Sequence, residues 1–172
     1  MFFVRTVSKD DLAAVSTLLS ETWHDTYDGI YGRGKVAEIT ASWHSIDTLE
    51  DQLERPHSEF IVADDGTRLG GVAFAAMSEQ ASSDQAKVAM LHQLYVHPDC
   101  QGQGIGLDLL EEISNALSDA SILKLEVDPA NTKAVAFYEA AGFAKTVETQ
   151  DCGGNSGIPA DVYELQLTRA GS

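Results

Sequence analysis

The spacing of apolar residues predicts a strand and then an amphipathic helix at the beginning of the chain. Phe2 to Val7 is expected to form a strand, and Ser8 with Asp11 three residues later forms the capping-box pattern that starts a helix. The apolar face of this helix consists of Leu12, Val15, Leu19 and Trp23. A break is expected at Asp28 and Gly29, because glycine is unfavourable inside a helix.

Two further helical segments are expected next. The second helix directs an apolar face inward, formed by Val36, Ile39, Trp43 and Ile46. A shorter helical piece around Thr48 to Leu53 ends before Pro56, because a residue that precedes proline is disfavoured in the helical conformation.

Three strands are predicted in the middle of the chain. Glu59 to Ala63 alternates as a strand, and Leu69 to Met77 returns as its hairpin partner after a turn at 64–66. Ser78 to Ala86 is small and polar, which is typical of a loop. Lys87 to Val96 is then the long central strand.

The last part of the chain alternates between helices and strands. Gly106 to Leu117 is an amphipathic helix, and the strand Leu123 to Val127 after it is expected to lie parallel to the central strand. A helix from Asn131 to Ala141 follows, closed by Gly142. Strands near Phe143 to Thr149 and Ala160 to Leu167 complete the pattern. The pattern predicts one domain over residues 1–172, a mixed α/β sheet with helices on both faces.

Composition and charge narrow the class of protein. With 44% hydrophobic and 22% charged residues, and no run of about 18 apolar residues, the chain is expected to be globular without a membrane span. The N-terminus becomes charged too early for a signal peptide, so we expect a cytoplasmic protein. Cys100 and Cys152 have no metal-ligand spacing, so we expect no metal. The net charge of −16 argues against a nucleic-acid partner. It is explained either by a solvated acidic surface or by attraction of a cationic amine.

A glycine-rich turn follows the central strand. Gly102, Gly104 and Gly106 alternate just before a helix, so backbone N–H groups and the positive helix end can approach a phosphate. The pattern is shared by dinucleotide, nucleotide and coenzyme A binders. A P-loop is disfavoured, because no Lys-Ser/Thr pair follows Gly104.

Two motifs resemble the GNAT superfamily of N-acetyltransferases. The acetyl-CoA motif of that family is matched by Gln101, Gly104 and Gly106. Its second signature, after the next strand, is matched by Asn131, Ala134, Phe137, Tyr138, Gly142 and Phe143. The resemblance implies a central sheet of about six to seven strands, with a splay between the two central parallel strands.

The resemblance also implies acetyl-CoA as cosubstrate, no metal, and direct attack by a primary amine in a ternary complex. Backbone groups for the pantetheine are then expected on the strand residues Leu94, Tyr95 and Val96. The pyrophosphate is expected on Gln101, Gly102, Gln103, Gly104, Ile105 and Gly106. Asn131 either caps its helix or also contacts the cofactor, and both roles can hold together.

Tyr138 is the expected proton donor to the departing thiolate, by resemblance, although it could also be a packing aromatic. The family often has a glutamate base where this chain has His92. His92 could serve as the base or be an ordinary sheet residue, and Glu126 is a weaker candidate. Strand alternation predicts that His92 shares a face with Leu94 and Val96.

The acceptor site is expected in the segment from Trp23 to Gly32. Trp23 and Tyr27, with Asp25 and Asp28, could hold an ammonium group by cation–π and charge contacts, and Glu126 could face the substrate. Equally, Trp23 could be a core residue and the aspartates solvated. The chain is similar to acetyltransferases of small amines of the polyamine type, and nearly as similar to ribosomal-protein N-terminal acetyltransferases. An acetyl-CoA-binding domain without activity, and a homodimer, remain open.

Overall fold

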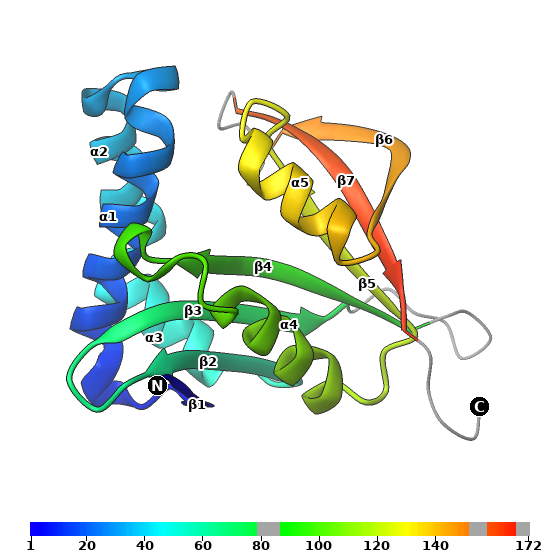
Figure 1. Cartoon of the computed structure of the whole chain (residues 1–172), viewed down its shortest axis with the longest axis horizontal. Coiled ribbons are helices and arrows are strands. Elements are labelled where there is room, and N and C mark those ends of the chain that lie inside the picture. Colours follow the sequence, from blue (N-terminus) through cyan, green and yellow to red (C-terminus); the bar gives the residue numbers. More distant parts are fainter. Residues whose placement is uncertain (79–86, 152–157, 168–172) are drawn as a thin grey trace.

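The computed structural model describes residues 1–78, 87–151 and 158–167, which form a seven-stranded sheet flanked by helices (Figure 1). The strand order is β1-β2-β3-β4-β5-β7-β6. The strands are β1 Phe3–Thr6, β2 Ser58–Asp64, β3 Leu69–Met77, β4 Val88–Val96, β5 Ile122–Val127, β6 Ala144–Asp151 and β7 Pro159–Gln166. The helices are α1 Leu12–Tyr31, α2 Arg33–Trp43, α3 Ile46–Glu54, α4 Ile105–Ala116 and α5 Thr132–Ala140, with short 3-10 helices η1 Lys9–Asp11 and η2 Pro98–Cys100.

The two central strands, β4 and β5, pair only over the first four residues of each strand. Their parallel register runs from Val88 opposite Ile122 to Leu91 opposite Leu125. Beyond Leu91, β4 continues to Val96 alongside β3, and Figure 1 shows β5 diverging from it. The other strand pairs are antiparallel. The predicted mixed sheet with a splay between two parallel strands is confirmed.

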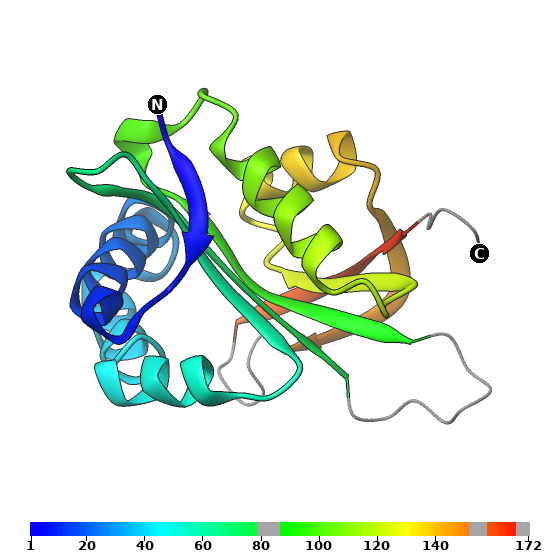
Figure 2. The same cartoon turned by 90° about the horizontal axis from the view of Figure 1, so that it is seen from below.

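Helices cover both faces of the sheet, as predicted. Figure 2 shows α1, α2 and α3 on one side and α4 and α5 on the other. The core beneath α1 and α3 includes Val15, Leu19, Leu49, Phe60 and Phe74. The core beneath α4 and α5 includes Leu91, Leu109, Ile113, Leu123 and Leu125. Each such buried side chain contributes about 1.5–3 kcal/mol to folding.

Helix α1 is longer than predicted. It continues through Asp28 and Gly29 to Tyr31 and ends at Gly32, whose φ of 86° is in the left-handed region. A glycine inside a helix costs only about 1 kcal/mol, which burial of a side chain such as Tyr27 exceeds. The prediction of a break at Asp28 and Gly29 is therefore wrong.

The boundary between α2 and α3 also differs from the prediction. Ser45 caps α3 by accepting a hydrogen bond from the Thr48 N–H at 3.2 Å, so α3 starts at Ile46. Ile46 is 47% exposed and does not point inward with Val36, because it belongs to a new helix with its own apolar face. Residues 79–86 of the predicted loop, and Cys152, lie outside the described residues.

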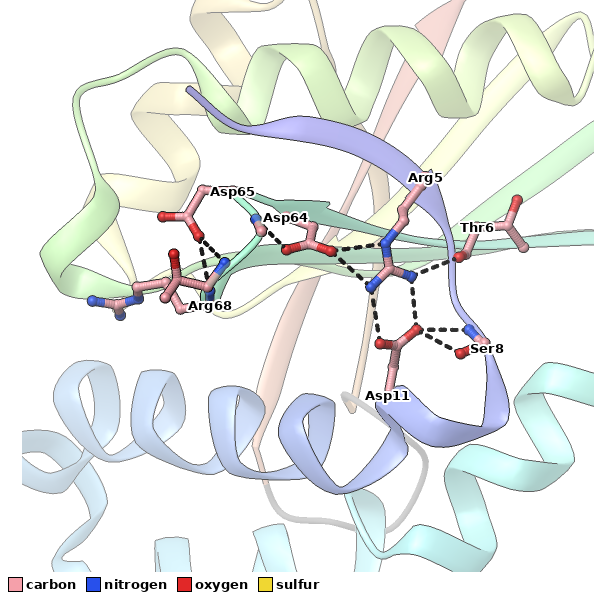
Figure 3. Close-up of polar contacts among 9 residues, drawn as sticks. Arg5, Thr6, Ser8, Asp11, Asp64, Asp65 and Arg68 are labelled. Carbon is pink, nitrogen blue, oxygen red and sulfur yellow. Dashed lines mark hydrogen bonds and ion pairs between the residues drawn. The ribbon is translucent and has the colours of Figure 1, made fainter.

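An ion-pair cluster joins the first strand to the start of the first helix (Figure 3). The Arg5 guanidinium donates to both carboxylate oxygens of Asp11, at 2.8 and 2.9 Å, and to Asp64 at 2.9 Å. Asp11 also accepts from the Ser8 N–H at 2.8 Å, the capping contact that the sequence predicted. The Arg5 hydrogen bonds lower the pKa of Asp11 to about 2. The cluster therefore fixes β1 against the end of β2 and the beginning of α1.

Candidate active site

The splay between β4 and β5 opens into a cleft of about 710 Å³. It is bordered by α1 on one side and by α4 and α5 on the other (Figure 1). Its lining contains nearly every site residue that the sequence predicted: Trp23, Tyr27, His92, Leu94, Tyr95, Val96, Gln101, Gly102, Gly104, Ile105, Gly106, Glu126, Asn131 and Tyr138. Gln103 is not among the lining residues, so the structure does not bring it to the cleft.

The turn between β4 and α4 is built by glycines at two left-handed positions. Gly102 has φ 81° and Gly104 has φ 82°, and α4 starts directly after them at Ile105. Other L residues rarely adopt such angles, which explains why glycine stands at both positions. The first turn of α4 directs its N–H groups toward the cleft, an arrangement suited to a phosphate. The Gln101 side chain supports the turn by donating to the Val96 carbonyl at 3.2 Å.

Helices α4 and α5 approach each other closely beside this turn. A Cβ atom at Gly106 would lie 3.1 Å from ring atoms of Phe137. The third glycine of the motif therefore serves helix packing, while Gly102 and Gly104 serve the turn. Phe137 packs against the core.

A β-bulge in β4 changes the direction of His92. Gln93 pairs with Phe74 and Leu91 with Ala75, so His92 is an extra residue in β4. Its ring stacks on Phe74, at 5.5 Å between centroids, on the sheet face that α1 covers. The prediction that His92 shares a face with Leu94 and Val96, which pack toward α4, is wrong, because simple alternation does not continue through a bulge.

The His92 side chain is exposed to the cleft. Protein atoms around the ring lower its pKa to about 4, and the positive charge of Arg55 adds to this effect. His92 is therefore neutral at pH 7, with a free ring nitrogen able to accept a proton.

Tyr138 is presented to the cleft by α5. Asn131 caps this helix by accepting from the Ala134 N–H at 3.3 Å, as predicted. Tyr138 is 8% exposed and makes edge-to-face contacts with Phe137 and Phe143. Burial raises the pKa of Tyr138 above its usual value, and Tyr27 adds to this effect. The phenol is therefore protonated at neutral pH and available as a proton donor.

Aromatic side chains of α1 form the wall opposite α5. Trp23 and Tyr27 are 3% and 5% exposed, with ring centroids 4.5 Å apart, and both line the cleft. Trp23 is therefore a core residue, as one prediction had it, and it also lines the cleft, as the other did. The Asn131 amide donates to the Tyr27 hydroxyl at 3.3 Å, which links α1 to α5 across the cleft.

Acidic groups dominate the charges that line the cleft. Among the described residues that line the cleft, the carboxylates are Asp25, Glu126 and Asp128, and the one permanently cationic side chain is Lys133. Asp28 was expected in this site but is not among the lining residues, and its carboxylate lies 2.7 Å from the His24 ring. The sequence analysis missed Asp128, which is 2% exposed and accepts a hydrogen bond from Tyr31. Its position directly after a buried strand is a signal that could have found it, since ligands bind at carboxyl ends of strands.

The cleft fits acetyl-CoA in three respects. Its volume is large enough for an extended ligand, the glycine turn and the start of α4 suit a pyrophosphate, and the β5-facing edge of β4 borders the cleft beyond Leu91. No group of His, Cys, Asp or Glu side chains within residues 1–78, 87–151 and 158–167 could hold a metal ion. The Cys100 thiol is free and buried.

Comparisons with known proteins agree with this geometry. Residues 26–163 match the model of the acetyltransferase (GNAT) domain family. The spermidine N(1)-acetyltransferase of Thermoplasma acidophilum is 25% identical over 168 residues, covering 94% of this chain and 97% of that protein. The N-alpha-acetyltransferase RimI of Mycobacterium tuberculosis is 31% identical over 96 residues, 55% of this chain and 57% of RimI. The L-amino acid N-acyltransferase MnaT of Escherichia coli is 26% identical over 96 residues, 55% of this chain and 56% of MnaT.

Solved structures share the fold. The PaiA N-acetyltransferase from Thermoplasma acidophilum, in complex with coenzyme A, has a TM-score of 0.81 over 96% of this chain and 99% of that chain, at 23% identity. Since the family model covers most of the sequence, this protein belongs to the GNAT family of acetyltransferases. It is thus an enzyme whose acetyl donor is acetyl-CoA.

Proposed function

We propose that the protein transfers the acetyl group of acetyl-CoA to a primary amine of a small cationic molecule, with a polyamine as the preferred acceptor. The observation that carries this proposal is the acidic lining of the cleft, with Asp25, Glu126 and Asp128 against Lys133. An acidic lining attracts an ammonium substrate and raises its local concentration. The similarity to a spermidine N(1)-acetyltransferase over nearly the whole chain supports the same acceptor class.

Binding of the donor follows from the backbone around the turn. The pyrophosphate would lie at the turn from Gln101 to Gly106 and at the start of α4, where N–H groups and the helix dipole favour negative charge. The pantetheine would lie along the β5-facing edge of Leu94 to Val96, and Asn131 would border it from α5. The thioester would then lie in the cleft that His92 and Tyr138 both line.

The acceptor nitrogen must first release one proton to solvent, because an ammonium has no lone pair with which to attack. The neutral amine nitrogen then forms a bond to the thioester carbon while the bond from that carbon to sulfur breaks, and the nitrogen loses a second proton. His92 accepts this proton, directly or through water, because its imidazole is neutral at pH 7. Tyr138 donates its phenolic proton to the leaving thiolate. Holding both reactants in one cleft supplies the remaining rate enhancement.

A thiol-release assay with acetyl-CoA and a panel of acceptors tests this proposal. The panel contains diamines and polyamines, neutral amino-acid amides, aminoglycosides, and peptides with free N-termini. Faster thiol release with the polyamines than with the peptides supports the proposal. Release with peptides alone would contradict it and favour N-terminal acetylation, the activity in the name of RimI. Stabilisation by acetyl-CoA without release for any acceptor would favour binding without catalysis.

A further inference from the structure

The lining of the cleft contains a buried carboxylate without a cationic partner. Asp128 is 2% exposed, its Oδ1 accepts from the Ala130 N–H at 2.9 Å, and its Oδ2 accepts from the Tyr31 hydroxyl. Both donors are neutral, and no basic side chain in the described part of the chain pairs with Asp128. Buried charges are normally paired, and a carboxylate has about four acceptor positions, of which two are used here.

The aromatic residues of α1 connect this carboxylate to the reacting end. Trp23, Tyr27 and Tyr31 follow one another at intervals of four residues, with centroids 4.5 Å apart for the first pair and 5.7 Å for the second. Tyr31, at the end of this row, is the residue that bonds to Asp128. The face of the Tyr31 ring already accommodates a cation, since Lys35 Nζ lies 5.1 Å from its centroid.

We propose that Asp128, held by Tyr31, binds a second ammonium group of the acceptor and thereby selects diamines and polyamines over monoamines. This inference rests on the proposed function and assigns the residue that determines its specificity. Tyr27 is close enough to Tyr138 to raise its pKa, and Tyr31 is one helical turn, about 6 Å, further along α1. Three or four methylene groups place two nitrogens about 5 to 6 Å apart, given bonds of about 1.5 Å. An acceptor of this length reaches both ends.

The first test uses the wild-type enzyme with unbranched diamines of two to six methylene groups and with monoamines of equal length. We expect kcat/KM to be highest for three or four methylene groups and to exceed that of the matched monoamine by about tenfold or more, as expected for a charge-assisted hydrogen bond. Equal kcat/KM for 1-aminobutane and 1,4-diaminobutane would show that Asp128 does not bind a second ammonium group. Acetylation of small cationic amines would still stand. If no amine is acetylated, the proposed function itself fails.

The second test replaces the carboxylate. Asp128→Asn should raise KM for 1,4-diaminobutane about tenfold or more and should lower kcat/KM for the diamine much more than kcat/KM for 1-aminobutane, while KM for acetyl-CoA changes less than about twofold. Asp119→Asn, which removes the same charge from an exposed residue outside this cleft, should leave the preference for the diamine unchanged. Equal losses for the diamine and the monoamine in Asp128→Asn would assign a structural role to Asp128. The chain-length series on the wild type decides the question if Asp128→Asn does not fold.

Discussion

The Tyr31 hydroxyl donates a hydrogen bond to the Asp128 carboxylate and so joins the last turn of α1 to the end of β5. One helical turn earlier, the Tyr27 hydroxyl accepts from Asn131 at 3.3 Å. These two contacts connect segments about a hundred residues apart in the sequence. The proposed site for the acceptor amine therefore depends on the packing of α1 against the loop between β5 and α5. The proposed site for the acetyl-CoA pyrophosphate is instead formed by one local turn, between β4 and α4.

Tyr138→Phe tests the proton donor. The variant keeps the ring in its contacts with Phe137 and Phe143 but removes the hydroxyl. We expect kcat to fall about a hundredfold, the usual contribution of a general acid, with KM for acetyl-CoA nearly unchanged. Tyr163→Phe is the matched control, because Tyr163 is also buried but does not line the cleft. Unchanged kcat in Tyr138→Phe would exclude the phenol as the acid.

His92→Gln tests the proton acceptor through the pH dependence of kcat, in short assays with enzyme kept at pH 7. Protonation of the acceptor amine lowers kcat of both enzymes equally as the pH falls, so the ratio of wild-type to variant kcat isolates the effect of His92. The pKa of His92 is lowered to about 4, so this ratio should stay at about ten to a hundred from pH 7 to about 5 and fall near pH 4. A kcat equal to that of the wild type at every pH would assign the base to another group, with Glu126 the next candidate in the lining.

Gly104→Ala tests the anion-binding turn. Its φ of 82° costs a residue with a Cβ about 1–2 kcal/mol, although there is open space for the Cβ. We expect the turn to relax and KM for acetyl-CoA to rise about tenfold, as measured by initial rates. Gly66→Ala is the control, because φ is 91° and the space is open there too, in the turn between β2 and β3. It should lose similar stability without a change in KM. Equal KM values for the two variants would contradict the assignment of the turn.

Buried His44 makes stability depend on pH. It is 3% exposed, and burial lowers its pKa from 6.5 to about 4. The unfolded chain therefore binds the proton first, and protonation favours unfolding. The contribution of neutral His44 is complete above pH 6.5 and is lost as pH falls toward 4, at up to about 1.4 kcal/mol per pH unit.

Urea denaturation between pH 7.5 and 4.5 measures this effect. His44→Gln should lower stability at pH 7.5 but reduce its dependence on pH, since one of the two histidines with a lowered pKa is removed and His92 remains. His57→Gln, at an exposed histidine, should keep the wild-type slope. The same slope in His44→Gln and the wild type would show that His44 is not the group responsible.

Local motifs explain why much of the donor site could be predicted from the sequence. Gly102 and Gly104 are needed by one turn, and Asn131 by one helix cap, so neighbouring residues alone reveal their roles. The bulge at His92 has no such signal, because it is defined by the register of β4 against β3. The continuation of α1 through Gly29 likewise depends on tertiary packing, which outweighs local propensity.

The acceptor site was harder to predict because its partners are distant in the sequence. Tyr31 was expected beyond the end of the first helix, where it could not extend a helical row of aromatic residues. Asp128 precedes the Asn131 motif and resembles an ordinary turn residue until the fold brings Tyr31 to it. Charge composition indicated an acidic protein, but only the fold shows which carboxylates line the cleft.

Identification of the acetylated product by mass spectrometry tests the central claim most directly. The enzyme is incubated with acetyl-CoA and an equimolar mixture of 1,4-diaminobutane, spermidine, 1-aminobutane and a peptide with a free N-terminus. We expect one acetyl group on the diamine and on spermidine, in amounts well above those on the monoamine and the peptide. Acetylation of the peptide in preference to every small amine would contradict the account.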